Sequence, residues 1–115
     1  MNAGQLNQQL LDAAERLRQS LDDLYQRSVE YASAEQAYRH GKAVAYLSTT
    51  GAKTVAEREA RAENAINDLR YRRDMAEGLK VSALEAVRSN RGILSAMQTL
   101  ASLSKEEAAF ARTGP

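Results

Sequence analysis

The residues best suited to chemistry in this sequence are cations, and they gather near the middle of the chain. Residues 39 to 73 hold eight Lys and Arg against four Asp and Glu, whereas residues 1 to 38 hold three against six. Such a local excess is typical of a surface that contacts phosphate groups, and nearby tyrosines offer faces on which single-stranded bases stack. The candidate nucleic-acid-binding residues are Arg39, Lys42, Lys53, Arg58, Arg61, Arg70 and Arg72.

The same cations also fit an ordinary solvated helix surface. Glu57 and Arg61 have the four-residue spacing that favours an ion pair on a helix. The net charge of the whole chain is only +1, unlike that of a strongly basic DNA-binding protein. Charge alone therefore leaves both interpretations open.

The densest cationic cluster is Arg70-Tyr-Arg-Arg-Asp74, and its successive side chains point around a helix. They cannot all contact one ligand. Arg73 lies near the inner seam of the predicted helix, where a pair with a carboxylate such as Glu35 or Glu30 is favoured over phosphate contact. Tyr31 and Tyr38 are expected to pack in the seam with a polar tip rather than form a stacking platform.

Residues that support catalysis or metal binding form no recognisable pattern. His40 is the single histidine, and no acidic residue has the spacing to form a metal pair with it. Glu57, Glu59 and Glu63 match neither a di-metal motif nor a catalytic carboxylate pair, and serine-nucleophile and phosphate-loop signatures are absent. The chain has no cysteine, which excludes disulfides and thiolate metal sites. We therefore expect no catalytic residue, no cofactor, no metal and no small-molecule substrate.

Two long helices must position these residues. No proline precedes the final position, and 21 Ala and 13 Leu occur among many other good helix formers. Gly51 favours the left-handed conformation that ends a helix, and Thr54 to Glu57 fits a capping box that begins the next one. The sequence predicts one all-α domain over residues 1–115, a long antiparallel, coiled-coil-like helical hairpin. Its helices span about 6–49 and 55–109, with a turn at 50–54.

The first predicted helix carries a heptad seam. Every seventh position is apolar or aromatic at Leu10, Leu17, Leu24, Tyr31, Tyr38 and Ala45. The neighbouring three-and-four spacings are filled by Leu6, Ala13, Ala14, Leu21 and Ala34. Gly41 is unfavourable in a helix interior by roughly 1 kcal/mol, so it indicates either tight packing or a local kink.

The second predicted helix carries two adjacent apolar stripes. Its main stripe consists of Ala62, Ile66, Leu69, Ala76, Ala83, Val87, Leu94, Met97 and Ala101. The second stripe consists of Leu79, Ala86, Ile93 and Leu100. Two stripes are more than one partner helix covers, so this helix is predicted to have two neighbours.

Breaks in these helices would give a different fold. Gly78 and Gly92 weaken the second helix, and a break near 89–92 would let its C-terminal part fold back. With another break near Gly41, the alternative is a monomeric three- or four-helix bundle.

Self-association is expected to complete the core. A helix of about 45 residues is roughly 65 to 70 Å long, and a lone pair of such helices has one seam and no enclosed core. Alanine contributes little apolar area, so an oligomeric helical bundle is predicted. The candidate oligomerisation residues are Leu10, Leu17, Leu24, Ile66, Leu79, Val87, Leu94 and Met97.

Signals for export or membrane insertion are missing from the sequence. The N-terminus lacks the charged start and apolar run of a signal peptide, and no segment approaches the roughly 20 apolar residues that span a bilayer. The expected location is the cytoplasm, with no membrane partner.

Three segments carry a resemblance: Glu57-Arg-Glu-Ala-Arg-Ala-Glu, Asp68-Leu-Arg-Tyr-Arg-Arg-Asp-Met-Ala-Glu and Arg91-Gly-Ile-Leu-Ser-Ala-Met-Gln-Thr-Leu-Ala-Ser. In them the sequence is similar to small helical proteins encoded by tailed bacteriophages, which often accompany single-strand annealing or single-strand-binding proteins. The likeness extends from about residue 30 to 102. It implies an accessory of phage recombination or replication, comparable to a recombination mediator, in the host cytoplasm.

The sequence therefore predicts a non-catalytic homo-oligomer that binds single-stranded DNA or a recombination or single-strand-binding protein. The alternative is a protein-binding adaptor or inhibitor that acts on a phage or host protein without DNA contact. A scaffold within a virion is a third interpretation.

Overall fold

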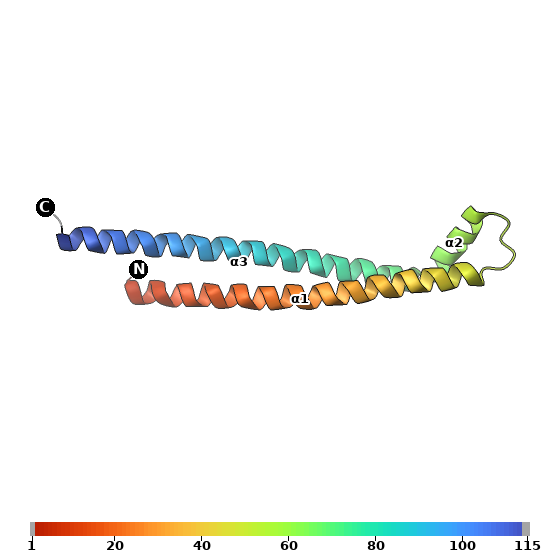
Figure 1. The fold of residues 1–115 in the computed structure, drawn as a ribbon, viewed down its shortest axis with the longest axis horizontal. Helices are drawn as coiled ribbons and strands as arrows, with labels where there is room; N and C mark the ends of the chain where they lie inside the picture. Colours follow the sequence, from red (N-terminus) through yellow and green to blue (C-terminus); the bar gives the residue numbers. More distant parts are fainter. Residues whose placement is uncertain (1, 114–115) are drawn as a thin grey trace. The chain divides into compact units, whose positions relative to one another are not determined.

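The computed structural model describes residues 2–113, and over that range it contains three α-helices and no strand (Figure 1). Helix α1 spans Ala3–Ser48, α2 spans Val55–Ala65 and α3 spans Asn67–Thr113. The predicted all-α class is confirmed. The predicted helix limits at about 6, 49, 55 and 109 lie within four residues of the observed ends.

α1 begins at a reciprocal cap that was not predicted. The side-chain oxygen of Asn2 accepts a hydrogen bond from the Gln5 backbone N–H at 2.8 Å, and the Gln5 side-chain oxygen accepts one from Asn2 N at 3.0 Å. Both side chains therefore satisfy backbone donors that the first turn of a helix leaves unpaired.

Two side-chain hydroxyl groups donate hydrogen bonds at the C-terminal end of α1. Ser48 Oγ donates to the Val44 carbonyl and Thr49 Oγ1 donates to the Tyr46 carbonyl, both at 2.7 Å. Gly51 is left-handed as predicted, with φ of 76°, but it lies in the loop beyond the end of α1. Gly51 therefore redirects the loop, while the hydroxyls of Ser48 and Thr49 add hydrogen bonds to carbonyls near the end of the helix.

The predicted cap of the next helix is confirmed. Thr54 is the N-cap of α2, and its Oγ1 accepts a hydrogen bond from Glu57 N at 3.0 Å. The Glu57 carboxylate accepts from Lys53 N, also at 3.0 Å. The acidic half of the box thus acts one residue earlier than in the usual arrangement, where it would reach Thr54 N.

The helix break that the sequence allows near 89–92 does not occur, because α3 continues through both Gly78 and Gly92. A glycine costs a helix only about 1 kcal/mol, which packing along the rest of the helix offsets. The break falls instead at Ile66, where φ is −118° and the backbone N–H donates to Glu63 O at 3.3 Å. Ile66 is itself buried, so the chain bends where an apolar side chain is held in place.

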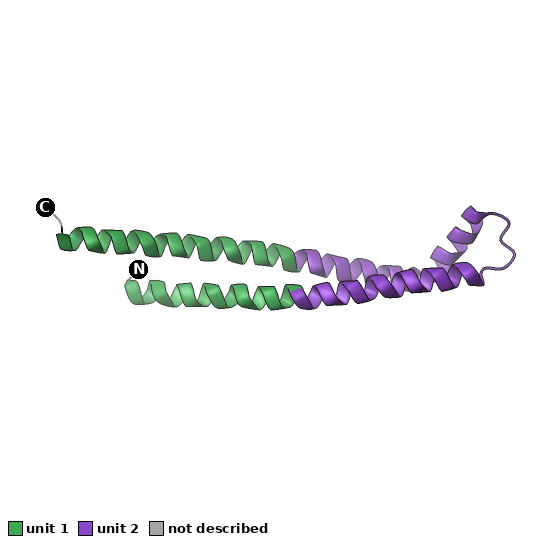
Figure 2. Cartoon of the chain, viewed as in Figure 1, with its two compact units in different colours: residues 1–24, 83–115 green, residues 25–82 purple. Residues whose placement is uncertain are grey.

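The chain forms two compact units (Figure 2). Of the described residues, unit 1 contains 2–24 and 83–113, and unit 2 contains 25–82. Unit 2 thus holds the end of α1, all of α2 and the start of α3. Unit 1 holds the start of α1 and the rest of α3.

In unit 2, α1 runs antiparallel to the chain that follows the loop. The Glu35 carboxylate lies 3.8 Å from the Arg73 guanidinium, and further along α1 the Lys42 ammonium lies 2.8 Å from the Glu63 carboxylate. Later residues of α1 therefore contact earlier residues of the chain that follows the loop, which is the order of an antiparallel pair. This order is the one predicted for residues on the two sides of the Gly51 turn.

In unit 1, the core is a narrow seam between α1 and α3. Its buried apolar residues are Leu6, Ala13, Ala83 and Val87. Val87 is the largest of the described side chains that are fully buried, at 2% exposure. The seam therefore fully excludes water from only a few side chains on each helix.

The predicted heptad seam of α1 is confirmed at its seventh positions, but two residues of the neighbouring set, Ala14 and Leu21, are exposed. All six of its seventh-position residues, from Leu10 to Ala45, are buried or half-buried. Between Leu17 and Leu24, however, Ser20 fills the seam at 8% exposure, whereas Leu21 is 41% exposed. The seam tolerates this serine because its Oγ donates to the Leu17 carbonyl at 2.8 Å. Leu21 is left for another contact.

Gly41 permits a close approach of α3. The helix is continuous through this residue, and a Cβ placed there would clash with the Cδ1 methyl of Leu69 and lie 3.7 Å from Ile66 Cγ2. Tight packing therefore explains the glycine, and α1 does not break there as the bundle alternative requires. Around Gly78, apart from the neighbouring backbone of its own helix, no atom lies within 4 Å of the same added carbon.

Replacing Gly41 with Val should destabilise the fold by about 1–3 kcal/mol, because the added methyl groups meet Leu69 and Ile66 in a packed seam. Gly78→Val is the matched control, since it makes the same chemical change at an open helical site and should leave stability unchanged or slightly raised. Urea unfolding followed by circular dichroism measures both. Equal effects at the two sites would contradict the close approach at Gly41.

Candidate functional site

The seven predicted nucleic-acid-binding cations all lie in unit 2. Arg39 and Lys42 are on α1, Lys53 is in the loop, Arg58 and Arg61 are on α2, and Arg70 and Arg72 are on α3. The fold therefore brings cations from three helices into one unit. What they contact inside that unit decides how much positive charge is left for a ligand.

Most of these cations have partners within the chain. Arg39 lies 2.8 Å from the Glu35 carboxylate, and Arg61 lies 2.8 Å from that of Glu57. Arg61 also donates to the Thr50 carbonyl at 2.7 Å. These contacts tie cations to neighbouring groups on the same helix and in the loop.

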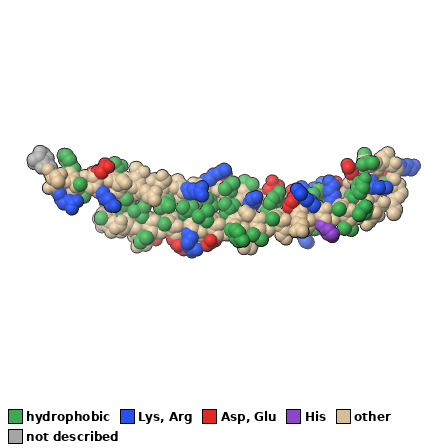
Figure 3. Space-filling model, viewed as in Figure 1, with side chains coloured by type: hydrophobic (Ala, Val, Ile, Leu, Met, Phe, Trp, Pro, Cys, Tyr) green, Lys and Arg blue, Asp and Glu red, His purple; other side chains and the backbone are tan. Residues whose placement is uncertain are grey.

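The other engaged cations reach across elements. Lys42 and Arg70 approach Glu63 at 2.8 and 3.5 Å, and the Arg58 guanidinium lies 5.3 Å from the centre of the Tyr46 ring. Two of the seven predicted cations, Lys53 and Arg72, have side chains that make no ion pair, hydrogen bond or ring contact with the described residues. The visible surface accordingly shows Lys and Arg interleaved with Asp and Glu (Figure 3).

Glu63 is the central polar residue of unit 2. Its Oε1 accepts a hydrogen bond from the Tyr38 hydroxyl at 2.8 Å and lies 2.8 Å from Lys42 Nζ. Its Oε2 is buried without a hydrogen bond, and Arg70 Nη1 at 3.5 Å is its cationic neighbour. The hydrogen bonds from Lys42 and then Tyr38 lower the pKa of Glu63, and the bond to Glu63 raises the pKa of Lys42. Glu63 therefore joins α1, α2 and α3 as a structural carboxylate.

Arg73 has the structural role that its position predicted. Its guanidinium lies 4.0 Å from the centre of the Tyr38 ring and 3.8 Å from the Glu35 carboxylate. The hydrogen bond from Arg73 to Asp74 raises the pKa of the Arg73 guanidinium above its ordinary value. A cation held between a ring and two carboxylates is committed to the fold, so Arg73 is not available to a phosphate.

The tyrosines divide into packed and exposed groups. Tyr38 is buried and Tyr31 is half-buried, with Lys80 Nζ 5.0 Å from the centre of its ring, which confirms the predicted seam packing of both. Tyr25 and Tyr71 are 72% and 65% exposed. Of these, Tyr71 stands between Arg70 and Arg72 in the sequence, so it is the ring best placed for a base in the predicted nucleic-acid surface.

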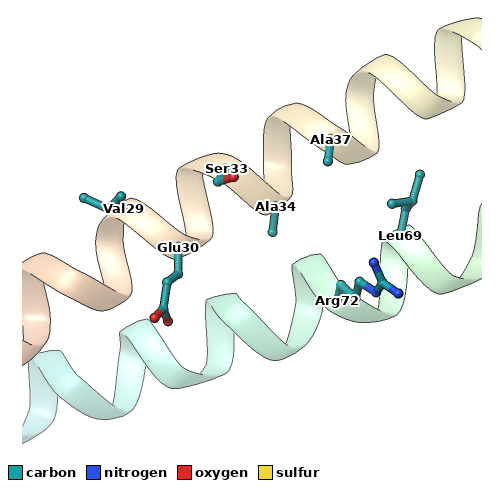
Figure 4. Close-up of a pocket in the computed structure, with 7 residues that line it drawn as sticks. All are labelled: Val29, Glu30, Ser33, Ala34, Ala37, Leu69 and Arg72. Atoms are coloured by element: carbon teal, nitrogen blue, oxygen red, sulfur yellow. The ribbon is translucent and has the colours of Figure 1, made fainter.

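A shallow groove of about 440 Å³ runs between α1 and α3 in unit 2 (Figure 4). Small side chains open it on α1, and Leu69 and Arg72 line it from α3. Glu30 and Arg72 place opposite charges within the same groove (Figure 4). A groove with this lining suits a side chain of a docked polypeptide better than a phosphate, which Glu30 would repel. The α1 residues of the lining are Val29, Glu30, Ser33, Ala34 and Ala37.

Within the chain, seven of the eight predicted oligomerisation residues pack in the α1–α3 seams. Ile66 and Val87 are buried, and Leu10, Leu17, Leu24, Leu94 and Met97 are half-buried. Leu79 is the exception, at 42% exposure. The role of these residues in association stays a prediction, and their burial shows that they first serve the fold of the single chain.

The second stripe of α3 remains uncovered. Ile93 is 40% and Leu100 is 46% exposed, Ala86 is exposed, and Leu103 continues the stripe. The main stripe, by contrast, is buried or half-buried at every predicted position from Ala62 to Ala101. The second neighbour predicted for this helix is therefore not supplied by α1.

An exposed apolar face on α1 was not predicted. It contains Leu11, Ala14 and Leu21, of which Leu11 is 66% exposed. Ala14 and Leu21 had been assigned to the seam because they also fit three-and-four spacings with Leu10, Leu17 and Leu24. The spacing from Leu11 could have predicted this face. Arg18 and Leu21 follow Leu11 by seven and ten residues, so the three lie on one side of the helix, next to the seam.

Comparison with known proteins does not assign this chain to a family. No family model matches it, and neither a curated protein nor a solved structure does. Among residues 2–113, no three His, Cys, Asp or Glu side chains are grouped so as to hold a metal ion. Over the same range, none of the helices has the length and apolarity required to cross a membrane.

Replacing Glu63 with Gln should lower stability at pH 7 by about 1–2 kcal/mol, because the charge-assisted contact with Lys42 is lost. Since folding lowers the pKa of Glu63 below 4.5, its charged form stabilises the protein above that pH. This contribution disappears as the pH falls through the lowered pKa. Urea unfolding at pH 7 and pH 3 should therefore show a smaller acid-induced loss in Glu63→Gln than in the parent.

The control for this prediction is Glu85→Gln. Glu85 pairs with Arg88 at 2.7 Å, but both side chains are more than 60% exposed. An exposed pair of this kind contributes little, so stability at pH 7 should change by less than about 0.5 kcal/mol. Equal losses in the two variants would show that Glu63 has no special role.

Proposed function

We propose that this protein is a non-catalytic helical accessory protein that works by docking onto other proteins, including its own copies. The uncovered stripe of α3 carries the proposal, with Ile93 and Leu100 exposed on a helix whose main stripe is already packed. The resemblance to phage proteins suggests the class of partner, a single-strand annealing or single-strand-binding protein. In that role the chain acts as an accessory of DNA recombination or replication.

The energetic argument rests on the thin core of the chain. Three of the eight buried residues in the described range are alanines, and one is a serine. Covering a half-exposed Leu or Ile contributes on the order of 1–2 kcal/mol at about 25 cal/mol/Å². Several such residues in line on one helix therefore favour a helical partner, which binds through the same i, i+3, i+4, i+7 spacing.

The charges of unit 2 support protein docking over nucleic-acid binding. Arg39, Arg61 and Arg70 have acidic neighbours, so a phosphate must compete with carboxylates for each of them. The opposite charges of Glu30 and Arg72 in one groove are also unfavourable to a polyanion. Both features suit a polypeptide with mixed charges.

Single-stranded DNA binding is the second candidate, and Tyr71 is the observation that favours it. This exposed ring is next to Arg72, whose side chain is unpaired over the described residues. Exposed ion pairs contribute only about 0–1 kcal/mol, so the cations of Arg39 and Arg61 could exchange a carboxylate for a phosphate. In an oligomer, repeated weak contacts would add through avidity.

Surface binding to immobilised single-strand annealing and single-strand-binding proteins from tailed phages tests the leading proposal. The double variant Ile93→Glu/Leu100→Glu should weaken binding at least tenfold, because it places two charges in the apolar contact. Ser95→Glu is the matched control, since Ser95 is exposed on α3 outside the stripe and should bind as the parent does. Parent protein that binds neither probe would contradict the proposed partner class.

Fluorescence anisotropy with labelled oligo(dT) at 20 to 300 mM salt tests the second candidate. The leading proposal expects little binding even at low salt. Tight binding that weakens steeply with salt, and that falls further in Lys53→Ala/Arg58→Ala/Arg61→Ala, would establish the DNA candidate instead. The triple variant keeps the α3 stripe, so its oligomeric state serves as the control.

A further inference from the structure

Unit 1 carries two exposed apolar faces on different helices. The α1 face consists of Leu11, Ala14 and Leu21, and the α3 face consists of Ala86, Ile93 and Leu100. Ser89 and Ala96 fill the positions between the residues of the α3 face, so no charge interrupts it. The α1 face covers about three helical turns and the α3 face about four.

The single charged residue within the α1 face is neutralised in place. Arg18 lies between Ala14 and Leu21, and its guanidinium contacts Glu15 at 2.6 Å and Asp22 at 2.8 Å. Both carboxylates are on the same helix, so Arg18 reaches away from the apolar side chains toward them. The α1 face can then be covered without burying an unpaired charge.

The two faces lie on opposite sides of the α1–α3 seam. A groove on one side is lined by Leu10, Leu11 and Ala14 from α1 and by Leu94 from α3. A separate groove is lined by Ala13 and Arg16 from α1 and by Ile93 and Met97 from α3. The two grooves share no residue, and each one contains part of one face.

Heptad geometry explains the separation. On each helix the a and d positions form the seam, with the e positions on one side of it and the g positions on the other. In an antiparallel pair, e positions of one helix lie next to e positions of the other, and g positions lie next to g positions. Leu11, Ala14 and Leu21 follow one flank of α1, whereas Ala86, Ile93 and Leu100 follow the other flank of α3. The apolar faces therefore point away from each other within one chain.

This arrangement decides which symmetry covers both faces. Because the two faces lie on opposite sides of unit 1, a single two-fold contact would bury one face of each copy and leave the other exposed. Covering both by two-fold contacts would require one α1–α1 contact and one α3–α3 contact. A contact between the α3 face of one copy and the α1 face of another leaves a free face at each end. A third copy can then add, and the assembly grows or closes into a ring.

Charge favours the mixed contact. The α1 part of unit 1, residues 2–24, holds two basic and four acidic residues, whereas the α3 part, residues 83–113, holds four basic and three acidic residues. A contact between two α1 faces would bring like charges together. A contact of α1 with α3 joins an acidic segment to a weakly basic one.

We propose that copies of this chain assemble head to tail, with the α3 face of one copy docked on the α1 face of the next. The inference rests on the self-association within the proposed function and adds its geometry. The assembly contains more than two copies, and every contact requires one face of each kind. Within the assembly each docked face is occupied by another copy of this chain, and in an open assembly the α3 face left free at one end is the docking face of the proposed function.

Complementation between two broken variants tests this geometry. Leu11→Glu/Leu21→Glu breaks the α1 face, and Ile93→Glu/Leu100→Glu breaks the α3 face. Light scattering after size exclusion at about 100 µM should show the parent as more than two copies and each variant alone as a monomer. An equimolar mixture of the two should form a species of two copies and nothing larger, because one intact contact remains.

The outcomes separate this inference from the proposed function. A parent dimer that persists in one of the two variants, with no new species on mixing, would overturn the head-to-tail geometry and leave self-association in place. A monomeric parent would overturn the head-to-tail geometry and the self-association, whereas docking onto a partner protein is decided by the surface-binding measurement. The control Gln19→Glu/Ser95→Glu adds two charges at exposed positions outside the faces and should assemble as the parent does.

Disulfide trapping provides a second measurement that does not depend on broken variants. The natural chain has no cysteine, so single cysteines report one position each. A mixture of Leu21→Cys and Ile93→Cys chains should form mixed disulfides in preference to either homodisulfide on mild oxidation. Preferential homodisulfides of Ile93→Cys would instead show a two-fold contact through α3 and overturn the proposal.

Discussion

The seam between α1 and α3 fully buries only a few side chains on each helix, and this constraint governs the rest of the molecule. Alanine and serine occupy much of it, so the two helices approach closely but bury little apolar area. The large aliphatic side chains that are buried are Leu6 and Val87 in unit 1 and Ile66 in unit 2. A seam this thin leaves other apolar residues without cover, which is why both helices present further apolar faces.

Polar contacts complete what the narrow seam cannot supply in unit 2. Glu63 receives Tyr38 and Lys42 from α1, while Arg73 stacks on Tyr38 and reaches Glu35. These groups specify how α1 meets α2 and α3, because each has few alternative partners of the right geometry. The carboxylates in these contacts neutralise nearby cations, so the surface of unit 2 is less basic than its number of Lys and Arg residues would suggest.

The interaction proposed for this protein follows from that division. In unit 2, many charged residues form ion pairs and hydrogen bonds within the unit. Unit 1 has few such pairs between its two helices, and it carries the exposed apolar faces of α1 and α3. Docking through apolar helix faces needs no catalytic group and no enclosed pocket. It also explains how a chain with so small a core could gain stability, since each added copy would cover faces that the monomer leaves in water.

Sequence alone determined the helical class, the turn after Ser48, the Thr54 cap and the main stripes, because these depend on local capping chemistry and on the heptad period. It also indicated the uncovered stripe of α3, since two stripes exceed one partner. Tertiary structure decided what periodicity leaves ambiguous. Ser20 rather than Leu21 enters the seam, the break falls at Ile66 rather than near Gly92, and most predicted cations meet carboxylates. Each of these depends on which residue of a facing segment is within reach, and spacing along one helix does not contain that information.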